Sequence, residues 1–173
     1  MFRIRHLALA LALATPLAAP AQSVEFDIAP TLDCLERTKR SVLRPACVSE
    51  AAQACVQRLP ARSPVGVSLC MEQETRYWAG RMEQALDALE ELARARDAAF
   101  AETEMAAQVP FKLVDDLALM QSAWEEWREK RCAFEAMMHR GTPEASMQAA
   151  WCMTRSTGRH ALFLEKELEA ARD

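Results

Sequence analysis

The side chains with the clearest chemical meaning are six cysteines, since cysteine can form disulfides, bind metals or act as a nucleophile. They stand at positions 34, 47, 55, 70, 132 and 152. Their spacing contains no Cys-x-x-Cys pair, and the two histidines in this part of the chain, His139 and His160, form no ligand pattern with them. We therefore predict disulfides, and neither a metal site nor a cofactor.

One pair of polar residues has the types of a nucleophile and its base. Ser156 and His160 are separated by one helical turn. A serine within a helix lacks the strained turn and the oxyanion hole of an activated serine. The chain also has no Gly-x-Ser-x-Gly sequence, no His-Glu-x-x-His sequence and no glycine-rich phosphate loop. The sequence therefore predicts no catalytic residues and a protein that is not an enzyme.

The first 21 residues have the three parts of a secretory signal peptide. A basic start with Arg3 and Arg5 precedes a short apolar run over residues 7–14 and the small residues Ala19-Pro20-Ala21. The run is too short for a membrane span, which takes about 20 apolar residues. No cysteine stands at the cleavage point for lipid attachment. We expect cleavage after Ala21 and a periplasmic or secreted protein, because disulfides persist in those compartments.

The net charge limits the kind of partner. The chain has 21 Lys+Arg and 25 Asp+Glu, a balance of −4. Loss of Arg3 and Arg5 with a signal that contains no acidic residue lowers this balance to −6. Nucleic-acid-binding proteins concentrate basic charge, so we expect no nucleic-acid partner. The acidic balance suits a basic partner, although mild acidity is common and mostly serves solubility.

Prolines separate the chain into periodic stretches that are rich in Ala, Leu, Glu and Arg, which favour helix. Proline is tolerated in the first turn of a helix and disruptive further in. The predicted helices cover about residues 30–39, 45–58, 64–108, 110–139 and 143–171. For the third helix, a bend or break after Asp97 is an open alternative. We predict an all-α fold, an elongated bundle or antiparallel hairpin of three long helices with two short N-terminal helices, stapled by disulfides.

The stretch 110–139 has the clearest apolar stripe, which predicts a seam against another long helix. Its members recur at steps of three and four: Leu113, Leu117, Met120, Trp124, Trp127, Arg131, Phe134 and Met138. The connections 59–69 and 139–143 are the predicted protruding loops.

Hairpin geometry ranks the fifteen ways to pair six cysteines. Consecutive helices that fold back on each other would join Cys34 to Cys47, Cys55 to Cys70, and Cys132 to Cys152. A swap among the first four cysteines is the main alternative.

Several residues over about positions 70–165 recur at helical spacings, most specifically in the run Gln-x-x-Trp-x-x-x-Arg-x-x-x-Cys. They are Cys70, Glu74, Trp78, Gln121, Trp124, Arg128, Cys132, Gly141, Thr142, Cys152, Thr157, Arg159 and Phe163. This order of residues resembles a known family, the LprI-like lysozyme inhibitor domains. With it, the chain divides into a signal peptide (1–21), a cysteine-rich helical extension (22–62) and an LprI-like helical domain (63–173).

The resemblance implies an all-α exported protein that binds a lysozyme or another envelope protein. The rival hypothesis is a structural or stress-related periplasmic protein with no lysozyme activity. If the motif builds the fold, we expect Glu74 to pair with Arg128 beside packed tryptophans, with Gln121 bound to a free backbone group. If it contacts a partner instead, its Trp and Arg side chains should form a surface patch. The sequence makes no prediction of oligomeric state.

Overall fold

A computed structural model describes residues 24–172, so the expected signal peptide and its cleavage point lie outside the described residues. This part of the chain contains five α-helices, one 3₁₀ helix and no strand, which confirms the predicted all-α class. The elements are α1 (Ala29–Arg37), η1 (Ser41–Cys47), α2 (Glu50–Arg58), α3 (Pro64–Ala101), α4 (Leu113–Met137) and α5 (Glu144–Arg172).

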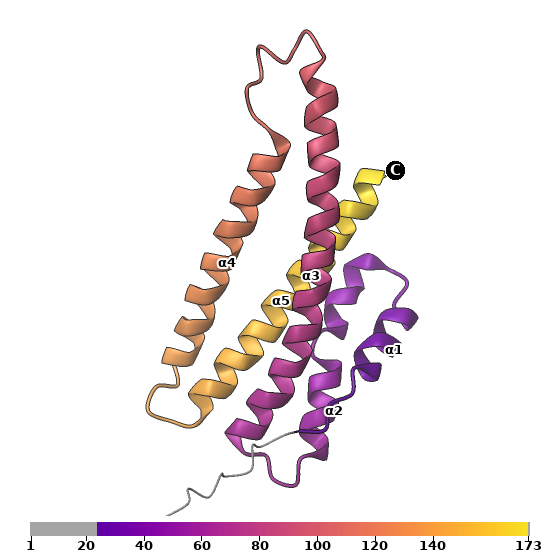
Figure 1. The fold of residues 1–173 in the computed structure, drawn as a ribbon. Helices are drawn as coiled ribbons and strands as arrows, with labels where there is room; N and C mark the ends of the chain where they lie inside the picture. Colours follow the sequence, from indigo (N-terminus) through magenta and orange to yellow (C-terminus); the bar gives the residue numbers. More distant parts are fainter. Residues whose placement is uncertain (1–23, 173) are drawn as a thin grey trace, which may run out of the picture.

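The three long helices form an elongated bundle (Figure 1). Helices α3 and α4 form an antiparallel hairpin. The chain reverses direction at the lower end of α4, and α5 then crosses α3. The most extensive contacts join α3 to α5, followed by those of α4 with α5. Of the short elements, α2 packs against the lower half of α3, α1 packs on α2 and η1, and η1 also contacts α5 (Figure 1). None of the helices within residues 24–172 has the length and apolar character needed to cross a membrane.

Two predicted helix starts behave differently. Ser63-Pro64 begins α3 as expected, with Ser63 Oγ accepting a hydrogen bond from the Gly66 amide at 3.0 Å. The expected start at Pro45 is wrong, because Pro45 lies inside the 3₁₀ helix η1 and α2 begins only at Glu50. Between them Ser49 adopts a left-handed backbone conformation (φ 86°), which reverses the chain before α2.

The core is centred on Trp78 of α3, which is fully buried. It packs with Leu35, Cys47, Val48, Ala161 and Leu162, so that the N-terminal segment, α3 and α5 share one apolar cluster. Gly158 allows this close packing, since a Cβ there would lie 2.5 Å from Val48 Cγ1.

The predicted apolar seam of α4 is only partly buried. Leu113, Trp127, Phe134 and Met138 are exposed, and the buried residues of α4 are Gln121 and Cys132. The reason is that α4 packs mainly on α5 and less on α3, so that part of the stripe faces solvent.

Three disulfides hold the described elements together. They join Cys34 to Cys47, Cys55 to Cys70, and Cys132 to Cys152, which are the pairs favoured by hairpin geometry, with no exchange among the first four. The first links α1 to η1, the second links α2 to α3, and the third links α4 to α5.

Candidate functional site

Glu74, on α3, is fully buried, and no ion pair within residues 24–172 involves it. Its carboxylate accepts hydrogen bonds from the backbone amides of Ser49 and Ala52, both at 2.7 Å. The Thr31 hydroxyl (3.0 Å) and Trp78 Nε1 (2.9 Å) donate to it as well. These four neutral donors come from α1, the α2 N-terminus and α3.

The expected ion pair between Glu74 and Arg128 is therefore wrong. Helix α2 has no side-chain cap of its own at Ser49, so its free amides take the Glu74 carboxylate, and the positive end of the helix favours that charge. Glu74 thus caps α2 from another helix. The same contact helps to fix the start of α2 at Glu50. The sequence pattern alone predicted this start too early, at Pro45.

The rest of the motif lies between α4 and α5. The rings of Trp124 and His160 stack with centroids 3.8 Å apart. His160 Nε2 lies 2.8 Å from Gln121 Oε1, while Gln121 Nε2 donates to Glu125 Oε1 at 2.9 Å. Gln121 therefore binds side chains, and the prediction of a backbone partner for it is wrong. Since an amide oxygen only accepts, His160 donates through Nε2–H, which both the neutral and the charged imidazole can do.

The surroundings of His160 favour its neutral form. Burial of the ring lowers its pKa, the positive charge of Arg128 lowers it further, and Glu125 opposes both, so that the pKa falls from 6.5 to about 4. Ser156 is buried and its Oγ lies 3.9 Å from Cys152 Sγ. The structure gives no hydrogen bond between Ser156 and His160 within the described chain, and nothing else there activates the serine.

Arg128 covers the other side of this cluster. Its guanidinium carbon lies 4.7 Å from the centre of the Trp124 ring, and its Nη1 is 3.4 Å from the buried Thr157 hydroxyl. Arg159, the last predicted motif residue, is exposed on α5. Most of the motif thus builds two buried junctions, one at α1–α2–α3 and one at α4–α5. No group of three His, Cys, Asp or Glu side chains within residues 24–172 is placed to hold a metal ion.

The surface that sequence reasoning missed is the connection between α3 and α4, residues 102–112, which we call the tip loop. Helix α3 ends at Ala101 and α4 begins at Leu113, whereas the expected connection was a single residue before Pro110. The tip loop is the end of the molecule farthest from α1 and α2 and extends past the end of α5 (Figure 1).

The tip loop is held at its base by Asp97 of α3. The Asp97 carboxylate accepts hydrogen bonds from the amides of Leu113 (2.9 Å) and Val114 (3.0 Å), so that it caps α4. Short turns follow α3, in which the Thr103 amide and hydroxyl both donate to the Phe100 carbonyl (2.9 and 2.7 Å). The loop therefore has a defined path and fixed ends.

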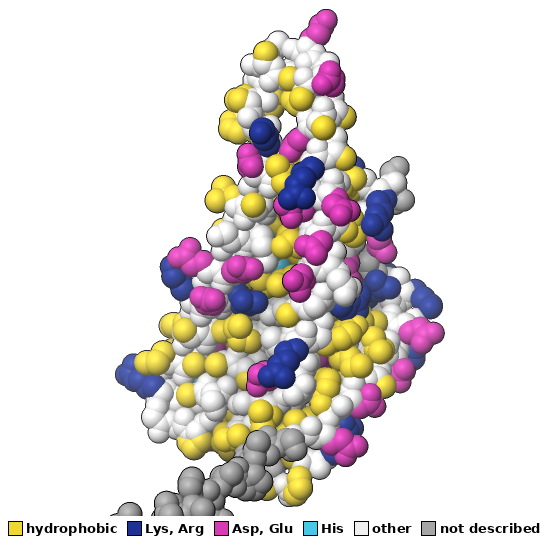
Figure 2. All heavy atoms as spheres, in the orientation of Figure 1, with side chains coloured by type: hydrophobic (Ala, Val, Ile, Leu, Met, Phe, Trp, Pro, Cys, Tyr) yellow, Lys and Arg dark blue, Asp and Glu magenta, His cyan; other side chains and the backbone are white. Residues whose placement is uncertain are grey.

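The tip loop exposes a concentration of apolar side chains. Phe111 is 75% exposed and Met105 is 50% exposed, and Val109 is also exposed. Glu102 and Glu104 stand beside them, also exposed. Figure 2 shows hydrophobic and acidic side chains together at this end of the molecule. The signal in the sequence was the run Val109-Pro110-Phe111, whose apolar residues fit neither helix stripe.

The comparisons with known proteins agree with the resemblance. The chain is 34% identical over 163 residues to an uncharacterized 17.7 kDa protein in the puhA 5′ region of Rhodobacter capsulatus, an alignment that covers 94% of this chain and 96% of that protein. No solved structure matches the chain significantly. The family model of the lysozyme inhibitor LprI matches residues 55–164, a range that contains the α4–α5 junction, the tip loop, and Glu74 and Trp78 of the other junction. The chain therefore belongs to the LprI lysozyme inhibitor family.

Proposed function

We propose that the mature chain is an exported binding protein of the lysozyme-inhibitor type, which contacts a lysozyme through the tip loop. Family membership supports the class of function, and three disulfides fit a compartment outside the cytoplasm. In this proposal the first 21 residues are removed after Ala21, and the protein is periplasmic or secreted. It acts by binding and is not an enzyme.

The observation that carries the proposal is the composition of the tip loop. Exposed aromatic and methionine side chains on a projecting loop offer the large apolar contacts that interface centres favour. Monomeric proteins seldom leave such groups together in water without a partner. The loop can also reach a concave surface, since it extends beyond α5 (Figure 1).

Charge supports a basic partner. Glu102 and Glu104 lie on the loop, and the mature chain has a balance of −6 after loss of the signal arginines. Complementary charge speeds encounter with a basic lysozyme and is weakened by salt. The apolar contact would remain at moderate salt, which separates it from a purely electrostatic attraction.

The burial of the motif favours a second function. Glu74, Trp78, Gln121 and Thr157 are buried and contribute to the two junctions, as expected if the motif serves the fold alone. On this alternative the protein is a structural or stress-related periplasmic protein. The predicted division into an extension (22–62) and a domain (63–173) is compatible with either function.

The test is an activity assay of several lysozyme classes with the purified, oxidised mature chain at low and moderate salt. We expect stoichiometric inhibition of at least one class that persists at moderate salt. If folded protein leaves every class fully active, the inhibitor function is wrong for this chain and the alternative stands.

A further inference from the structure

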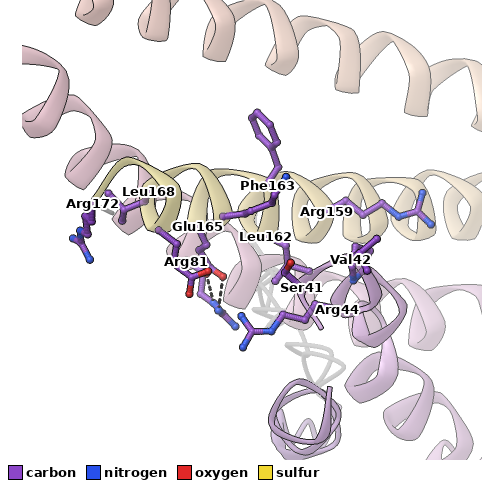
Figure 3. Close-up of a pocket in the computed structure, with 13 residues that line it drawn as sticks. Ser41, Val42, Arg44, Arg81, Arg159, Leu162, Phe163, Glu165, Leu168 and Arg172 are labelled. Carbon is purple, nitrogen blue, oxygen red and sulfur yellow. Dashed lines mark hydrogen bonds and ion pairs between the residues drawn. The ribbon is translucent and has the colours of Figure 1, made fainter. Parts of the chain in front are cut away.

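A second surface feature lies along α5. A groove of about 520 Å³ is lined by residues of η1, α3 and α5 (Figure 3), and we call it the basic groove. Its volume falls in the range of sites that hold small molecules, about 300–1,000 Å³. It is separate from the tip loop, because none of its lining residues lies within 102–112.

One ion pair in the lining is complete. Arg81 of α3 donates to both carboxylate oxygens of Glu165, from Nε at 2.6 Å and from Nη2 at 2.7 Å, and its Nη1 donates to the Tyr77 hydroxyl at 3.1 Å. Burial alone would lower the pKa of Arg81, but the hydrogen bonds and charges of Glu165 and Tyr77 outweigh it, so the pKa is raised above its ordinary value. Glu165 is thus fully occupied by this arginine.

The other cations of the lining have no such partner. Arg44 of η1 extends toward Arg81 beneath α5 (Figure 3). Its Nε is buried with no hydrogen-bond partner, and no carboxylate within residues 24–172 forms an ion pair with it. Buried donors in proteins are normally hydrogen-bonded, so the partner of this one is expected to be a ligand or a water molecule.

The rim adds more positive charge. Arg159, Lys166 and Arg172 line the groove, and no ion pair to a carboxylate of the described chain involves them. Glu169 is the one lining carboxylate apart from Glu165. Positive charge therefore gathers here although the whole chain has a balance of −4. Guanidinium groups suit carboxylate and phosphate oxygens in particular.

An apolar wall completes the groove. Val42 of η1 is 71% exposed beside it, and Leu162 and Leu168 of α5 form part of its lining. An inorganic anion would leave this wall in water, whereas a molecule with both an acid group and a hydrocarbon chain would cover it.

We infer that the basic groove binds a single-chain amphiphile with a carboxylate or phosphate head, the head on Arg44 and the chain along Val42, Leu162 and Leu168. This inference is independent of the tip loop and of lysozyme. The two kinds of head share the same chemistry, that of oxygens able to accept charge-assisted hydrogen bonds from a guanidinium.

Isothermal titration calorimetry of the oxidised mature chain tests it, with decanoate, decyl phosphate, inorganic phosphate and decanol as probes. We expect saturable binding of decanoate, decyl phosphate or both, and binding at least about tenfold weaker for inorganic phosphate and for decanol. A preference between the first two identifies the head group. Equal affinities for inorganic phosphate and decyl phosphate would show that the hydrocarbon chain does not contribute to binding, and would overturn the inference.

Variants locate the site. Arg44→Gln should weaken binding about tenfold or more, since a charge-assisted contact is lost. The fold should survive, because Arg44 Nε has no hydrogen-bond partner and no ion pair within residues 24–172 involves Arg44. Val42→Asp, at an exposed position, should weaken binding by repulsion. Arg140→Gln, at an exposed arginine outside the groove, is the control. Absence of saturable binding to the native chain, or binding that neither Arg44→Gln nor Val42→Asp changes, would overturn the inference.

Discussion

The two ends of this molecule are built in opposite ways. At the base, where α1, η1 and α2 pack on α3 and α5, Glu74 and Trp78 are fully buried and two disulfides join neighbouring elements. At the tip, residues 102–112 expose apolar side chains on a loop that Asp97 holds at its root. The polar and aromatic residues of the family motif therefore mainly hold the fold, while the surface that we propose for a partner lies in a segment without a conspicuous motif.

Loss of the Glu74 carboxylate should give the largest effect. Glu74→Ala leaves the amides of Ser49 and Ala52 and the Trp78 indole without their acceptor, and each buried donor left open costs about 1–3 kcal/mol. We expect a loss of about 3 kcal/mol or more in the free energy of unfolding, measured by urea denaturation of the oxidised protein. Glu72→Ala removes a carboxylate whose partner Arg76 is exposed, and should cost below about 1 kcal/mol. Similar losses for both variants would contradict the assigned role of Glu74.

Two glycines test how closely α5 packs on the base of the molecule. Gly158→Ala would place a Cβ 2.5 Å from Val48 Cγ1 and 3.1 Å from Trp78 Cε2, and we expect it to destabilise the fold by about 1–3 kcal/mol. Gly80→Ala on α3 meets no atom within 4 Å and should stabilise the helix by up to about 1 kcal/mol. Thermal unfolding of both variants decides this, and a stabilising effect of Gly158→Ala would refute the close packing of α5 on the base.

The pH dependence of stability tests the α4–α5 junction between the two ends. Because the pKa of His160 falls from 6.5 to about 4 on folding, the unfolded chain binds the extra proton first as the pH drops. The contribution of neutral His160 to the free energy of unfolding is complete above pH 6.5 and is lost as the pH falls toward 4. Over this interval the free energy of unfolding changes by up to about 1.4 kcal/mol per pH unit.

Denaturation curves at a series of pH values measure this slope. His160→Gln should flatten it over this interval, whatever its effect on absolute stability. His139→Gln, at the exposed histidine of the α4–α5 turn, should leave it as in the native chain. An unchanged slope in His160→Gln would show that the buried imidazole is not responsible.

The root of the tip loop should respond more weakly. Asp97→Ala removes the acceptor for the Leu113 and Val114 amides, and loss of such a cap costs about 1 kcal/mol. We also expect faster amide hydrogen exchange at the start of α4 and in the tip loop. Asp87→Ala, at an exposed position of the same helix, is the control, and equal exchange in the two variants would mean that Asp97 does not order the loop.

Much of the fold could be predicted from the sequence, because proline positions and helical periodicity are local signals. Ser63-Pro64 marked a true helix start, and hairpin geometry indicated the same cysteine pairs that the structure joins. The partner of Glu74 could not be predicted, since its donors come from amides whose availability depends on how α2 meets α3. Spacing placed Glu74 and Arg128 on helix faces correctly but gave no information on which faces meet.

The tip loop escaped prediction for a different reason. Residues 98–108 have a composition that suits helix, and Pro110 indicates the start of the next one. The sequence therefore predicts a helix to about residue 108 and offers a break after Asp97 only as an alternative. The end of α3 at Ala101 depends on turn hydrogen bonds to the Phe100 carbonyl and on the Asp97 cap. Both are tertiary or turn features that a periodic pattern does not encode.

The most direct test of the account compares two exposed phenylalanines. Phe111 in the tip loop is 75% exposed and Phe134 on α4 is 65% exposed, so replacement of either by alanine should change stability by less than about 0.5 kcal/mol. Titration of a susceptible lysozyme with each variant should show inhibition weakened at least about tenfold by Phe111→Ala and unchanged by Phe134→Ala. Full inhibition by Phe111→Ala, or a greater loss with Phe134→Ala, would contradict the assignment of the tip as the contact surface.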